Sequence, residues 1–136
     1  MSLTPPLLKT ISLGQVITSA ANVNRDGTGV VSTLVTAGAS GSYVLAFAVT
    51  STNAIGVANS AAVARFFLSD NTGANYRLIS EVAINVTTPS ATVSGYSNSV
   101  TLNINLIPGQ LIGVTQSIYA GVQDIFNIIA NQVQNY

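Results

Sequence analysis

The chain has 136 residues, which fits one domain with a single core. Only 6% of the residues are charged while 48% are hydrophobic, so Ser, Thr, Asn and Gln must supply most of the polar surface. With no His and no Cys, the usual neutral-pH general base, thiolate nucleophiles and disulfides are excluded, and a net charge of +0 disfavours nucleic acid or anionic lipid as partners. We therefore expect no enzymatic activity, no cofactor or metal, and binding to neither nucleic acid nor membrane.

Residues 1–13 are predicted to form an extended N-terminal arm. Pro5 and Pro6 fix φ and favour an extended backbone. Leu3, Leu7 and Leu8 supply apolar side chains for contact with a partner. We expect residues 14–136 to form a single domain that follows this arm.

Strand patterns dominate that domain. Short runs rich in Val, Ile, Thr, Phe and Tyr alternate with clusters of Gly, Asn, Asp, Ser and Pro. Eight runs are predicted as strands: 15–20, 28–37, 43–52, 62–69, 76–87, 99–107, 111–118 and 125–133.

Two of these runs show clear periodicity. In 99–107 apolar residues alternate with polar ones, which is typical of a strand with one face in the core and one in water. The run 43–52 is apolar on both faces, which predicts a central strand covered on both sides.

Two hairpins are predicted from turn residues. Pro108 and Gly109 separate 99–107 from 111–118, and the polar loop 70–75 separates 62–69 from 76–87. Eight strands with near-regular turns favour an all-β, antiparallel β-sandwich, and eight is the strand number of a jelly roll. The pattern leaves open whether the connections are those of a jelly roll or of another Greek key.

Two polar loops are interpreted as structural turns. Asp26 precedes Gly27 and is expected to cap local amides, while Arg25 reaches a neighbouring carbonyl or acid. The loop at Asp70 resembles the start of a calcium-binding loop, but Gly73 is its fourth residue and not its sixth, and its twelfth falls on a predicted strand. A plain hairpin is therefore favoured over a metal site.

The acidic residues allow one further interpretation. Asp26, Asp70, Glu81 and Asp124 could pair as glycosidase carboxylates if they converged at about 5 to about 9.5 Å. A chain with so few charges needs them for solubility, so we expect scattered surface acids instead.

The shortage of charge itself predicts assembly. A monomer of this mass exposes on the order of 6,700 Å², so the charged side chains number roughly one per 800 Å². Unpaired sheet edges are commonly protected by Lys, of which only Lys9 is present. We therefore expect much of the surface to be covered, either by copies of the chain or by a larger body.

Four segments carry a resemblance. SAANVNRDGTG (19–29), TAGASGS (36–42), the hairpin 65–81 and TPSATV (88–93) are together similar to small β-sandwich virion proteins of tailed bacteriophages, over residues 15–129. The apolar arm and the charge-poor C-terminal half depart from that pattern.

This resemblance implies a structural role in the virion. The leading hypothesis is a capsid decoration, or cement, protein on the capsid exterior, which contacts the major capsid protein and itself, as a homotrimer. In that role Leu3, Pro5, Pro6, Leu7 and Leu8 would grip the shell.

The alternative is a receptor- or carbohydrate-binding module in the tail or neck. It would use loop-borne Asn and Tyr side chains, because amides bind sugar hydroxyls and aromatic rings stack on sugars. The candidates are Asn71, Asn75, Tyr76 and Tyr96.

Overall fold

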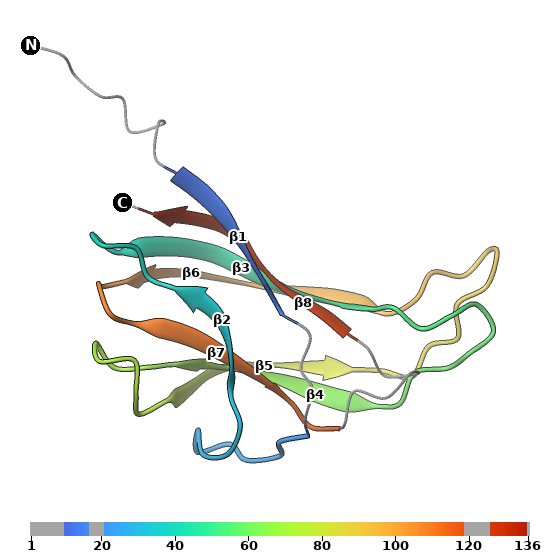
Figure 1. Ribbon diagram of the computed structural model, residues 1–136. Coiled ribbons are helices and arrows are strands. Elements are labelled where there is room, and N and C mark those ends of the chain that lie inside the picture. The colour runs from blue at the N-terminus through green and yellow to red at the C-terminus, as the bar shows by residue number, and fades with distance from the viewer. Residues whose placement is uncertain (1–9, 17–20, 119–125, 136) are drawn as a thin grey trace, which may run out of the picture.

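The computed structural model describes residues 10–16, 21–118 and 126–135, and every regular element in these ranges is a strand (Figure 1). The strands are β1 (Thr10–Val16), β2 (Ser32–Thr36), β3 (Ser42–Ser51), β4 (Ala62–Leu68), β5 (Arg77–Ile84), β6 (Ser97–Leu106), β7 (Leu111–Gln116) and β8 (Phe126–Asn135). The predicted all-β class and strand number are confirmed. No helix in the described ranges could span a bilayer.

The strands form two four-stranded sheets, ordered β1-β8-β3-β6 and β2-β7-β4-β5. Each pairing of β1 with β8, β2 with β7, β3 with β6 and β4 with β5 is antiparallel. The chain is thus one long hairpin, closed at β4 and β5 and rolled so that β3 also pairs with β8, and β4 with β7. This connectivity is that of a jelly roll, which settles the choice that the sequence left open.

The first strand lies earlier than predicted. β1 spans Thr10–Val16 and not 15–20, so residues 10–12, which the sequence placed in the arm, pair with β8. The reason is tertiary, because β8 continues to Asn135 and offers Thr10 a ladder partner there.

One predicted hairpin is wrong and the other is confirmed. The turn at Pro108 and Gly109 exists, closed by a bond from the Gln110 amide to the Ile107 carbonyl, but β6 and β7 lie in different sheets. Both sides of β7 are already paired, with β2 and with β4, so β6 has no place beside it. The hairpin of β4 and β5 forms as expected.

The core lies between the sheets. The rings of Phe47 on β3 and Phe66 on β4 stack at its centre, with centroids 4.2 Å apart and planes within 4°. Both side chains are fully buried. Around them lie buried aliphatic side chains of both sheets: Leu34, Val35, Val44, Val49, Val82, Ile84, Leu106, Ile112, Val114 and Ile128.

Of the two predictions made from clear periodicity, the one for β6 is confirmed and the one for β3 is corrected. β6 alternates as predicted, with Val100, Leu102 and Ile104 packed against the core. β3 is an inner strand as expected, but the chain alone covers only one of its faces, and Tyr43 and Ala48 on the other face stay half-exposed. Nothing within the described part of the chain packs a second layer on that face.

The loops gather at two ends. Loops 52–61 and 85–96 project together from one end, on the right of Figure 1, and turns 37–41, 69–76 and 107–110 lie at the other. The polar clusters described below lie in these loops, in the segment 21–31 that precedes β2, and on the sheet of β2, β7, β4 and β5.

Candidate functional site

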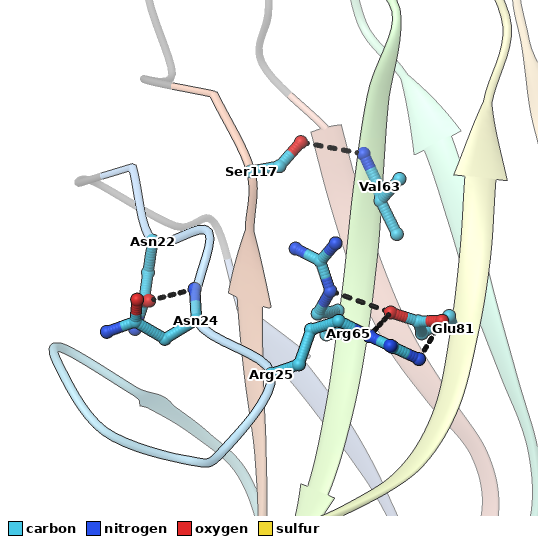
Figure 2. Close-up of polar contacts among 7 residues, drawn as sticks. All are labelled: Asn22, Asn24, Arg25, Val63, Arg65, Glu81 and Ser117. Atoms are coloured by element: carbon cyan, nitrogen blue, oxygen red, sulfur yellow. Dashed lines mark hydrogen bonds and ion pairs between the residues drawn. The ribbon is translucent and has the colours of Figure 1, made fainter.

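The main polar cluster of the described chain is centred on Glu81 of β5 (Figure 2). Its Oε1 accepts hydrogen bonds from Arg25 Nε at 3.0 Å and Arg65 Nε at 2.8 Å, and its Oε2 accepts one from Arg25 Nη2 at 3.1 Å. These bonds, from Arg25 first and then Arg65, hold the pKa of Glu81 below its ordinary value. Arg65 is 12% exposed while Arg25 is 65% exposed, so the cluster joins a flexible surface side chain to the sheet.

The Glu81 cluster ties down the segment that precedes β2. Arg25 comes from this segment, which runs over the outer face of the sheet formed by β2, β7, β4 and β5 (Figure 2). Of the two kinds of partner expected for Arg25, a carbonyl or an acid, the structure shows an acid, Glu81, 56 residues away in the sequence. Exposed ion pairs contribute at most about 1 kcal/mol, so the cluster orients this segment more than it stabilises the fold.

The side chain of Asn22 holds the same segment in place through hydrogen bonds to its backbone. Its side chain is 7% exposed and donates from Nδ2 to the Thr28 and Val30 carbonyls at 3.0 Å. Its Oδ1 accepts a hydrogen bond from the Asn24 backbone amide, and the backbone amide of Asn22 donates one to the Gln116 carbonyl of β7. Sequence spacing gives no sign of this role, because it does not show the partners of a buried amide.

Asp26 organises the tip of the segment. Its Oδ1 accepts the Thr28 hydroxyl at 2.6 Å and the Thr28 amide at 3.0 Å, which lowers the pKa of Asp26. Gly27 follows with φ +84, and a Cβ there would lie 2.4 Å from the carbonyl oxygen of Tyr76. The turn therefore needs glycine both for its backbone and for its close approach to the start of β5.

Asp70 organises the loop of the β4–β5 hairpin. Its Oδ1 accepts the Thr72 hydroxyl and the Thr72 and Ala74 amides, and its Oδ2 accepts Asn75 Nδ2 at 2.7 Å. These bonds, led by that from the Thr72 hydroxyl, hold the pKa of Asp70 far below its ordinary value. Both carboxylate oxygens are thus engaged by protein donors, and Gly73 supplies a positive φ of 78°.

Two open clefts flank this hairpin loop. One, of about 590 Å³, is lined by residues that include Asp70, Ile79 and Gln110, and the other, of about 350 Å³, by residues that include Asp26 and Tyr76. Both clefts share Asn75 and Arg77.

The residues proposed for sugar binding are only partly brought together. Asn75 and Tyr76 line the second cleft. Tyr96 instead packs against the core from the loop that precedes β6, and its hydroxyl donates to the Ala83 carbonyl. The sugar-binding hypothesis therefore retains Asn75 and Tyr76, with Arg77 as a neighbour that the sequence analysis did not include.

The two projecting loops are joined by a second buried asparagine. Asn59 is 2% exposed, and its Nδ2 donates to the Asn85 carbonyl at 3.0 Å while its Oδ1 accepts the Thr87 amide at 2.9 Å. The Gly56 amide donates to the Pro89 carbonyl nearer the tip. The pair of loops is therefore cross-linked, although the sequence showed only Asn and Gly in turn-like positions.

Several predicted residues lie outside the described ranges. They are Leu3, Pro5, Pro6, Leu7 and Leu8 of the arm, together with Asp124. Among the described acids, Glu81 is held by two arginines, while Asp26 and Asp70 bond to their own loops. No three His, Cys, Asp or Glu residues of the described ranges are grouped as a metal site would require.

Comparison with known proteins identifies no family. No protein-family model matches the chain, and no curated protein matches it. Among solved structures, a chain of infectious bursal disease virus, Gt strain, is similar at 13% sequence identity and a TM-score of 0.29. The match covers 99% of this chain and 42% of the viral chain, so this chain spans less than half of the viral chain's length. At this score the likeness carries no argument about function.

Proposed function

We propose that this chain is a non-enzymatic structural protein of a bacteriophage virion, a decoration protein that bridges neighbouring major capsid subunits on the outside of the shell. One observation carries the proposal: eight ionisable acids and bases are spread over 136 residues. A free domain keeps more charge than this to prevent association, so the composition fits a surface that is covered in the functional state.

The fold is compatible with this role. Jelly rolls occur in viral capsid domains, and also in lectins and cupins, so the architecture alone selects no function. The resemblance of the 19–29, 36–42, 65–81 and 88–93 segments to phage virion proteins favours the first of these groups.

In this role the protein would stabilise the shell by physical contact, with no chemical step. Each copy would bury uncharged surface against two capsid subunits, so that expansion of the shell must also break those contacts. An interface of about 1,600 Å² supports stable attachment, and repetition over the shell adds avidity. In this scheme the carboxylates of Asp26 and Asp70 shape loops and perform no chemistry.

The copy number of the protein in purified virions tests the proposal. A decoration protein is present in hundreds of copies, which quantitative mass spectrometry against the major capsid protein measures directly. A few copies per particle would move the protein to the tail or neck, and absence from virions would refute a structural role. Deleting residues 1–8 and measuring occupancy on purified shells then tests the arm, because unchanged occupancy would exclude it as the grip.

A second candidate function rests on the clefts beside Asn75. A tail or neck module that binds glycans would use Asn75, Tyr76 and Arg77, since amide and guanidinium groups bind sugar hydroxyls and Tyr76 offers a ring. A glycan array with the wild type and Arg77→Ala tests this candidate. Binding that Arg77→Ala weakens supports it, and the absence of binding to any glycan rejects it.

A further inference from the structure

Charge is distributed unequally between the two sheets. All six charged residues of the described ranges lie on the sheet of β2, β7, β4 and β5 or in loops that contact it: Arg25, Asp26, Arg65, Asp70, Arg77 and Glu81. The strands β1, β3, β6 and β8 contain no Asp, Glu, Lys or Arg. One whole sheet of the sandwich is therefore without charge.

The outer face of that sheet, which we call the charge-free face, is described over β3 and β6. Apart from the half-buried Leu45 of β3, its described side chains are small or carry a hydroxyl or amide group: Tyr43, Ala48, Thr50, Ser97, Ser99, Thr101, Asn103 and Asn105. Several polar groups on it already bond to each other, as the Tyr43 hydroxyl does to Asn103 Oδ1 at 2.5 Å. Covering such a face desolvates no charge, and its hydroxyl and amide groups can exchange water for hydrogen bonds to the groups of a facing surface.

Pairing between sheet edges offers a poor alternative route to assembly. Each of the edge strands β1, β2, β5 and β6 pairs with its inner neighbour through a register shift. In β6 the shift includes Asn103, which has a φ of +51°. Irregularities of this kind bend an edge away from a straight ladder, so the edges are protected although Lys is scarce.

We propose that the charge-free face is the surface through which copies of this chain bury one another. The occupant is a second copy, because a charged partner would have its own charges desolvated against a face that offers no opposite charge. The matching face of another copy meets this condition. A second copy on this face would also cover β3 on both sides, as the sequence predicts, whereas a single copy covers only one side.

The available area is adequate for such an interface. The three ten-residue strands and the seven-residue β1 of this sheet span about 600 Å² in projection, of which β3 and β6 carry the described side chains, and the accessible area of a corrugated face is larger. A standard interface buries about 800 Å² on each partner. The proposal goes beyond the proposed function, because it concerns contact between copies of this chain and not contact with the capsid, and it names the surface responsible.

Sedimentation velocity on the purified full chain tests this proposal with a matched pair of variants. Thr101→Lys places a charge on the exposed face of edge strand β6, and Thr33→Lys places the same charge at an exposed position of edge strand β2 in the other sheet. We expect an oligomer for the wild type and for Thr33→Lys, and at least a 100-fold weaker association for Thr101→Lys. Circular dichroism confirms that each variant is folded, and Ser99→Lys repeats the test at a second exposed position of the charge-free face.

Each possible result of these sedimentation experiments either supports or overturns a stated part of the proposal. Dissociation by Thr101→Lys or Ser99→Lys, with Thr33→Lys still associated, supports the proposal. Association that survives both charges, or that only Thr33→Lys disrupts, overturns it while self-association stands. A monomeric wild type overturns the proposal, whereas the capsid contact of the proposed function is decided separately by the copy number in virions. An oligomer that Thr101→Lys dissociates but that is absent from virions leaves this inference in place and rejects only the virion role.

Discussion

Replacing Asn59 with alanine should separate the two projecting loops. The Asn59 side chain makes three hydrogen bonds, to the Ser60 and Asn85 carbonyls and from the Thr87 amide, at 3.0, 3.0 and 2.9 Å. Each such bond contributes about 1 kcal/mol net, but Ser60 is adjacent and Asn85 is exposed, so water replaces part of the loss. We expect Asn59→Ala to lower the free energy of unfolding by about 2 kcal/mol.

Urea unfolding at one fixed protein concentration measures this loss, since self-association would otherwise shift the midpoint. Asn85→Ala is the matched control, because the loop contact uses its carbonyl and its side chain is exposed, so its effect should stay below about 0.5 kcal/mol. Asn59→Asp should be worse than Asn59→Ala at neutral pH, since a carboxylate oxygen would face two carbonyls. Equal stability of Asn59→Ala and Asn85→Ala would refute the view that Asn59 joins the loops.

Two further outcomes follow from the turns. Gly109→Ala should lower the stability of the fold by more than Gly56→Ala. Both glycines have positive φ, but a Cβ at Gly109 would lie 2.0 Å from the Asn71 carbonyl oxygen, whereas a Cβ at Gly56 would face open space. Thermal unfolding of the two variants measures the difference, and equal losses would exclude the clash. Acid should destabilise the fold: the pKa of Asp70 is lowered in the folded state, so its contribution is present above the unfolded value of about 3.9 and is lost as the pH falls below it. Asp70→Asn should therefore lose less stability than the wild type between about pH 4 and about pH 2 in urea titrations, and an identical acid response would contradict the role of Asp70.

Local features of the fold were predictable from the residues that form them. β6 follows from the alternation around Val100, Leu102 and Ile104, because side chains of a strand point to opposite faces in turn. The Asp70 loop follows from Asp, Thr, Gly and Asn within six residues, because all of its hydrogen bonds span five residues or fewer.

The polar clusters were less predictable. For Arg25 the sequence left open whether the partner is a carbonyl or an acid, and the acid, Glu81, lies 56 residues further on. Asn22 and Asn59 resemble any loop asparagine in the sequence, and only their burial against distant backbone shows that they hold segments together. Sequence spacing contains no information on such contacts.

By itself the sequence determined that this protein is an eight-stranded β-sandwich with very little charge, because strand periodicity, turn chemistry and composition act within a few neighbouring residues. The tertiary structure alone decided that β6 and β7 lie in different sheets and that every edge strand pairs through a register shift. It also decided that, within the described ranges, every charged residue lies on one sheet or in a loop that contacts it. These features depend on which strands become neighbours. That choice is made by competition for the two sides of each strand and for the shared core, and no local pattern encodes it.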